Sequence, residues 1–260
     1  ESHDTLNRRI ARGAAWMVGL RFADRLVGFL STLVLARLLV PADFGLVALA
    51  LAMVAAVGLL SEFGFELVLI QNQRAERRHY DTVWTFSVVR GLLTASIIAV
   101  IAEPLALFFD DPRLFDVMLV LSLMPLLDGF YNIGTVAFRK DLTMGKEFVF
   151  RIVPRIGGFF VTVGFALAWG NYWALIYGSV AGPALRLVMS YTMHRHRPRL
   201  SVAAWRDIIG FSKWTLVTSI AAFANKKLST LIIAKMLDAH SLGIFSMAAQ
   251  IADMASAEMI

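Results

Sequence analysis

STLVLARLL at residues 31–39 returns as STLIIAKML at residues 229–237. Five of the nine positions are identical, and the other four exchange similar residues. At the same offset of 198 residues, Trp16 aligns with Trp214. A long-period repeat in an apolar chain indicates two halves built on one plan, which in membrane proteins is typical of transporters.

The composition predicts an all-α, polytopic membrane protein. Hydrophobic residues make up 58% of the 260 residues, more than in an ordinary soluble domain. Apolar runs of about 20 residues, the length with which a helix crosses about 30 Å of hydrocarbon, recur along the chain. We expect helices near 14–39, 44–70, 84–109, 114–137, 148–169, 172–193, 209–237 and 242–260.

The segments that connect these helices alternate in charge, and this predicts their orientation. The N-terminal segment and the connections at 71–83, 138–147 and 194–208 carry 13 Lys and Arg residues in total, whereas the opposite connections carry only Arg113. Because positive loops stay in the cytoplasm, we expect a multi-pass membrane protein with a cytoplasmic N-terminus. Membrane topology also explains the net charge of +6 better than binding to nucleic acid does.

The two copies of the repeat are separated by six predicted helices, an even number, so both cross the membrane in the same direction. The fold class we predict is one six-helix transmembrane bundle at 1–200, followed at 201–260 by the first two helices of a second, parallel-repeat bundle. The chain begins with Glu1 and ends at Ile260 within an apolar stretch, so we interpret it as a fragment.

Basic residues within the predicted helices are candidates for substrate binding. A charge inside the bilayer is costly and usually faces a partner or a water-filled cavity. Guanidinium groups bind oxyanions with two parallel hydrogen bonds, so a cluster of them favours an anionic ligand. Arg90, Arg151 and Lys213 lie near helix ends, where snorkelling to the headgroups explains them better. The candidates for binding such an anion in a cavity are Arg21, Arg25, Arg155, Lys226 and Lys227.

Acidic residues in the same helices have two readings. Asp24 shares a helix face with Arg21 and Arg25, and Glu62 and Glu66 lie one turn apart. They are candidates for H⁺ or Na⁺ coupling or for charge balance. For the two glutamates, structural pairing with Arg21, Arg25 or Arg74 is the favoured interpretation. We expect no metal site and no other cofactor, and the absence of cysteine excludes disulfides.

Four motifs together resemble the polysaccharide transporter family, the oligosaccharide (O-antigen-type) flippases of the multidrug/oligosaccharidyl-lipid/polysaccharide exporter superfamily. They are RGAAW at 12–16, LARLLVPADFGL at 35–46, SEFGFELVLIQ at 61–71 and FSKW at 211–214. The resemblance implies two six-helix bundles around a central cavity. It also implies alternating-access export of undecaprenyl-pyrophosphate-linked oligosaccharides across the bacterial inner membrane for surface polysaccharide biosynthesis, with membrane lipids and the polymerase machinery as neighbours. The basic candidates named above would then line the pyrophosphate and sugar cavity.

Alternatives remain open within and outside this superfamily. A lipid II flippase handles a similar anionic lipid, whereas a cation-coupled multidrug exporter should have an acidic cavity. A membrane glycosyltransferase or polymerase would need a sizeable outer loop, and the chain has no P-loop or HExxH motif, so we do not expect an enzyme. HRHRPR at 194–199 is interpreted as a headgroup-facing segment rather than a metal site. Gly157, Gly158 and Gly164 predict close helix packing.

Overall fold

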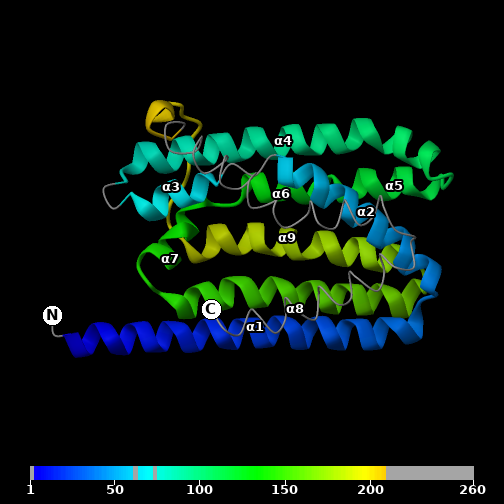
Figure 1. The fold of residues 1–260 in the computed structure, drawn as a ribbon, viewed down its shortest axis with the longest axis horizontal. Coiled ribbons are helices and arrows are strands. Elements are labelled where there is room, and N and C mark those ends of the chain that lie inside the picture. The colour runs from blue at the N-terminus through cyan, green and yellow to red at the C-terminus, as the bar shows by residue number, and fades with distance from the viewer. Residues whose placement is uncertain (1–2, 61–63, 73–74, 209–260) are drawn as a thin grey trace, which may run out of the picture. The chain divides into compact units, whose positions relative to one another are not determined.

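The computed structural model describes residues 3–60, 64–72 and 75–208, all within one compact unit, Glu1–Ile209. In these three stretches every regular element is helical (Figure 1). In chain order they are α1 (His3–Leu38), α2 (Pro41–Leu60), α3 (Phe65–Gln71), α4 (Arg77–Phe108), α5 (Arg113–Leu121), α6 (Leu123–Phe130), the 3₁₀ helix η1 (Ile133–Val136), α7 (Ala137–Lys140), α8 (Met144–Trp169) and α9 (Trp173–Met193).

The structure confirms helices in all six regions predicted before residue 194, but the single helix predicted at 44–70 is wrong. α2 ends at Leu60, and α3 begins at Phe65 after Gly64. Gly64 has a left-handed φ of 60°, which glycine adopts without a steric cost and which an α-helix does not contain. Glu66 therefore lies on a short separate helix rather than on a long transmembrane one.

The helix predicted at 114–137 is also wrong as one element, because the chain bends by 69° between Arg113–Phe130 and Ile133–Lys140. The bend leaves backbone groups without helical partners, and side chains satisfy them. Asn132 Oδ1 accepts a hydrogen bond from the Gly134 amide at 2.9 Å. The Phe130 carbonyl accepts one from the Tyr191 hydroxyl at 3.0 Å. The bend between the two helical segments is therefore stabilised by specific side-chain hydrogen bonds.

Two of the described helices, α4 and α8, are long and apolar enough to cross a membrane. The bent pair makes a third candidate if its two parts form one span. The predicted six-span bundle and the domain boundary at residue 200 stay predictions. The helices predicted at 209–237 and 242–260 lie outside the described residues, and so does the second copy of the repeat.

Small residues bring neighbouring helices into backbone contact. α8 packs on both α1 and α9, and α6 packs on both α9 and α4. A Cβ at Gly178 of α9 would overlap Thr162 of α8, and one at Gly91 of α4 would lie 2.6 Å from the Pro125 carbonyl of α6. Gly158 contacts α9 closely as predicted, but the prediction for Gly164 is wrong, because a Cβ there would meet no described atom within 4 Å.

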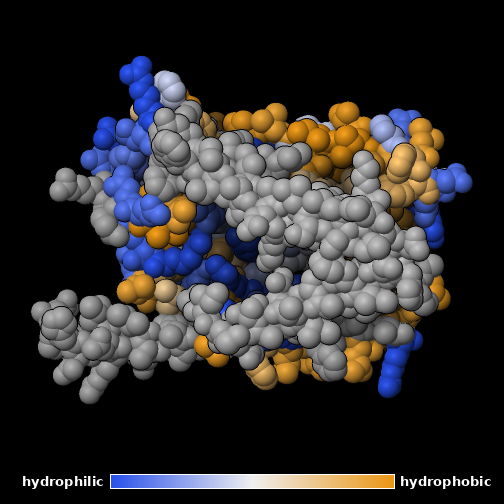
Figure 2. All heavy atoms as spheres, in the orientation of Figure 1, coloured by the Kyte–Doolittle hydropathy of each residue, from blue (hydrophilic) through white to orange (hydrophobic). Residues whose placement is uncertain are grey.

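The apolar core fills one end of the unit. It joins buried residues from the start of α2, the end of α4, α5 and the start of α9. Leu35 of α1 and Leu39, just after its end, belong to the repeated stretch and form a second buried cluster with Ala166 and Ala174. Hydrophilic side chains gather at the opposite end, where α4 begins, while hydrophobic ones cover α4 farther along (Figure 2). The candidate site reaches the apolar end, because Leu35 also lines the site.

Candidate functional site

A cavity of about 780 Å³ lies among α1, α6, α8 and α9. This volume is in the range of cavities that hold small-molecule ligands. Among the described residues, four arginines and three carboxylates line it, together with hydroxyl groups and aromatic rings. The charged lining residues are Asp24, Asp128, Arg139, Glu147, Arg151, Arg155 and Arg186.

Glu147 is the best-buried charge in this wall, with 8% of the residue exposed. Its Oε1 accepts a hydrogen bond of 2.6 Å from Arg151 Nε, one turn along α8. The same oxygen lies 3.7 Å from Arg139 Nε. Arg139 also forms an ion pair with Glu66 of α3. One carboxylate therefore holds two cavity arginines, and both guanidinium groups remain partly exposed.

The other two arginines have looser acidic partners. Arg155 Nε lies 4.0 Å from Asp24 Oδ1, and both side chains are about half exposed. Arg186 lies 3.6 Å from Asp128. The Arg186 guanidinium also stands 5.0 Å from the centre of the Tyr131 ring, which fixes its orientation by a cation–π contact. These pairs balance charge without burying it.

The spacing along α8 explains why its charges share one wall. Glu147, Arg151 and Arg155 are separated by four residues each, and positions four apart lie on the same helix face. Gly158 and Thr162 continue this face into the cavity lining. The i, i+4 series was therefore a usable signal in the sequence, although only Arg155 was proposed from it.

The structure brings some of the predicted site residues together. Asp24 and Arg155 line the cavity and face each other. Arg151, predicted to snorkel, stands in the cavity wall. The ion pair that the structure shows for Glu66 is with Arg139, a residue that sequence reasoning had assigned to a connection and not to the site.

Other predicted residues do not join this cavity. Arg21 and Arg25 are exposed on α1 and are not among the residues that line it. Sequence reasoning missed four of the lining charges, Asp128, Arg139, Glu147 and Arg186. The predicted residues outside the described part of the chain are Glu62, Lys226 and Lys227.

Comparison with known proteins places the chain in a family. The family model described as "Polysaccharide biosynthesis protein" matches residues 34–260. The chain belongs to the polysaccharide biosynthesis protein family. Membership confirms the resemblance that the four sequence motifs indicated.

Two curated proteins are similar to this polysaccharide biosynthesis family member over nearly its whole length. Lipopolysaccharide biosynthesis protein WzxC of Escherichia coli (strain K12) is 25% identical over 252 residues, which cover 95% of this chain and 51% of WzxC. Succinoglycan biosynthesis transport protein ExoT of Rhizobium meliloti (strain 1021) is also 25% identical over 252 residues, which cover 94% of this chain and 50% of ExoT. The chain thus spans about half the length of these relatives. No solved structure gives a significant match.

Proposed function

We propose that the protein moves lipid-linked oligosaccharide units across the bacterial inner membrane, and that the arginine-lined cavity holds the anionic pyrophosphate of the lipid carrier. The observation that carries this proposal is the set of four arginines around one cavity of about 780 Å³. Charged residues between apolar helices are rare and mark substrate paths. Planar guanidinium groups are suited to bidentate contacts with phosphate oxygens.

The carboxylates supply the charge balance that an empty cavity needs. Asp24, Asp128 and Glu147 each lie within 4.0 Å of an arginine. An incoming pyrophosphate competes with these carboxylates for the guanidinium groups, and the carboxylate–arginine ion pairs form again when the pyrophosphate leaves. This exchange makes binding reversible, as a transport cycle requires. H⁺ coupling through such a carboxylate stays a prediction.

The names of the relatives support the export of polysaccharide units over the export of other substrates. WzxC is named for lipopolysaccharide biosynthesis, and ExoT for transport in succinoglycan biosynthesis. A multidrug exporter for cations should present more acidic than basic groups, whereas arginines outnumber carboxylates among the described lining residues. Alternating access and a cytoplasmic N-terminus belong to the proposal.

The proposal is tested by substituting Arg155 and Arg186, the two cavity arginines whose ion pairs are the loosest. We expect Arg155→Ala and Arg186→Ala to weaken binding of a pyrophosphate-bearing polyprenyl lipid about 10- to 100-fold each, because a charge-assisted hydrogen bond is worth about 1.5–3 kcal/mol. Lysine at either position keeps the charge but loses the planar fork, so it should restore part of the affinity. Binding is measured on purified protein and export by complementation of a flippase-deficient strain.

Arg113→Ala is the matched control, because Arg113 begins α5 at the core end, bonds to Asp111 and does not line the cavity. It should leave binding and export unchanged. Wild-type binding by the Arg155→Ala, Arg186→Ala double variant would refute the cavity as the anion site. If Arg21→Ala, Arg25→Ala alone abolishes export, the exposed face of α1 holds the substrate instead.

A further inference from the structure

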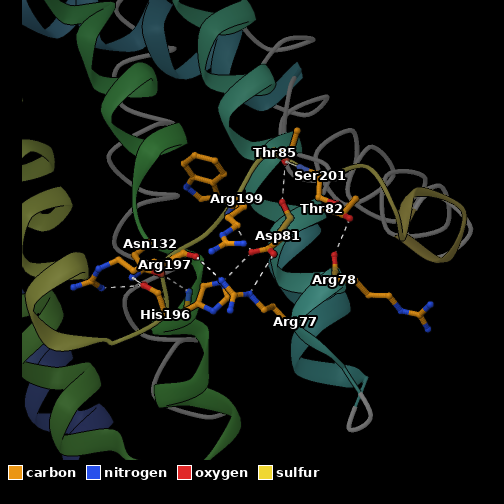
Figure 3. Close-up of polar contacts among 12 residues, drawn as sticks. Arg77, Arg78, Asp81, Thr82, Thr85, Asn132, His196, Arg197, Arg199 and Ser201 are labelled. Carbon is orange, nitrogen blue, oxygen red and sulfur yellow. Dashed lines mark hydrogen bonds and ion pairs between the residues drawn. The ribbon is translucent and has the colours of Figure 1, made fainter.

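The segment at 194–208, which follows α9 and is here called the strap, lies along the first turns of α4 (Figure 3). Three side chains of α4 accept hydrogen bonds from strap backbone amides: Asp81 Oδ1 at 3.2 Å, Thr85 Oγ1 at 2.9 Å and Thr82 Oγ1 at 3.2 Å. The donor amides belong, in the same order, to Arg199, Ser201 and Ala204.

The inner side of the strap also fits closely on η1. Asn132 Nδ2 donates a hydrogen bond to the His196 carbonyl at 2.6 Å. His196 Nε2 lies 3.2 Å from Asp81 Oδ1. A Cβ at Gly134 would lie 2.7 Å from His196 Cβ and would overlap the His194 ring. The histidines thus face the protein, and the strap is held in one orientation.

This docking leaves a mixed apolar and basic surface on the outer side. Leu200, Val202 and Trp205 are 73%, 57% and 46% exposed, and the Arg206 guanidinium lies 5.4 Å from the centre of the Trp205 ring. Large exposed hydrophobic residues in a cluster mark an interaction surface. The exposed arginines of the strap are Arg195, Arg197, Arg199 and Arg206.

The position of the strap along α4 indicates the depth of this surface. Ser201 is bonded to Thr85, and the exposed apolar residues of α4 begin four residues later at Val89 and continue to Val100 and beyond. Four residues of helix span about 6 Å. If the apolar flank of α4 faces lipid tails, Leu200 and Val202 therefore lie beside the boundary between tails and headgroups.

We propose that the strap binds the headgroups of anionic phospholipids. Its arginines contact phosphate groups, while Leu200, Val202 and Trp205 enter the boundary layer, where tryptophan is enriched in membrane proteins. Basic residues near a bilayer attract anionic lipids, whereas a neutral headgroup gives them no net attraction. The α4 side chains that hold the strap lie against its inner face, so lipids can bind to its outer face while the strap stays attached to α4.

The test compares the purified protein and its variants in phosphatidylcholine vesicles that contain spin-labelled phosphatidylglycerol or spin-labelled phosphatidylcholine. The strap variant carries Arg195→Gln, Arg199→Gln and Arg206→Gln. One basic residue near the membrane changes the affinity about fivefold at low salt, so we expect the preference for phosphatidylglycerol to fall at least about tenfold. Lysine at the same three positions should retain most of it.

The matched control removes three arginines from the N-terminal segment, with Arg8→Gln, Arg9→Gln and Arg12→Gln. It should lose clearly less of the preference for phosphatidylglycerol than the strap variant does. An equal loss in both triple variants would show general charge attraction and would overturn the proposal. The proposal would also be overturned if the strap variant kept its phosphatidylglycerol preference but no longer bound the pyrophosphate-bearing lipid, because the strap would then be a substrate-binding segment.

Discussion

Neutralising Glu147 should make the cavity bind pyrophosphate more tightly, if the proposed anion site is correct. Glu147 holds Arg151 at 2.6 Å and lies 3.7 Å from Arg139, so Glu147→Gln removes one negative charge beside both guanidinium groups. The glutamine carbonyl still accepts the bond from Arg151, which preserves the local geometry. Both arginines then become more available to a phosphate group.

The size of the effect follows from the distance between charges. Two unit charges about 4 Å apart interact by about 1 kcal/mol in water and about 4 kcal/mol at an effective dielectric constant near 20. The cavity arginines are partly exposed, so the lower value is the safe one. Because about 1.4 kcal/mol changes a binding constant tenfold, we expect at least about fivefold tighter binding. Export should slow, since release becomes harder.

Isothermal titration of purified protein with inorganic pyrophosphate, and then with a pyrophosphate-bearing polyprenyl lipid, measures this change. The control is Glu103→Gln, the same chemical change on the exposed far part of α4, outside the cavity lining. It should leave the affinity unaltered. Unchanged or weaker binding by folded Glu147→Gln would refute the argument that this carboxylate competes with the anion.

Three further predictions concern packing, pH and topology. Gly91→Ala should lower the free energy of unfolding by about 1–3 kcal/mol, since its Cβ meets the α6 backbone. The control Gly164→Ala, whose Cβ meets no described atom, should be neutral or stabilising by up to about 1 kcal/mol. Equal losses of stability in thermal unfolding of the two variants would contradict this. Burial lowers the pKa of His196, and together with the nearby charges of Arg77 and Arg197 it outweighs the attraction of Asp81, so the unfolded chain binds the proton more readily. The contribution of His196 to stability is then complete above about pH 6.5 and is lost as the pH falls from there through the pKa of the folded state. The melting temperature of His196→Asn should depend less steeply on pH than that of the wild type. An unchanged slope would exclude His196 as the source of the pH dependence. A cysteine at Ala75 should be labelled only from the cytoplasm, and labelling from the periplasm would invert the topology.

Apolar run lengths were enough to predict the helices, but not where they break. The bend after Phe130 depends on Asn132, whose side chain caps η1. An Asn followed two residues later by a Gly was a visible turn signal within the predicted helix. The break before α3 depends on Gly64, whose left-handed conformation no apolar pattern records.

The candidate site was only partly predictable for a different reason. Helical spacing puts Arg151 and Arg155 on one face, but it does not tell which neighbour that face meets. Arg139 reaches the wall because the chain bends before α7, and Asp128 and Arg186 meet because α6 packs on α9. The convergence of these helices depends on their rotation and close packing, which a single sequence does not specify.

The hydrogen bonds that hold the strap have a consequence for how its sequence is free to change. The bonds to Asp81, Thr82 and Thr85 use strap backbone amides, which every residue except proline provides. A further bond, from Arg77 of α4 to the Arg197 carbonyl, also uses the strap backbone. Substitutions at 199 and 201 should therefore leave these bonds intact, with proline as the exception, whereas a larger side chain at the buried Ala204 should displace the strap. The specificity of the attachment is encoded instead in the oxygen-bearing side chains of Asp81, Thr82 and Thr85. Recognition of this feature in other sequences should start from that triplet on the helix.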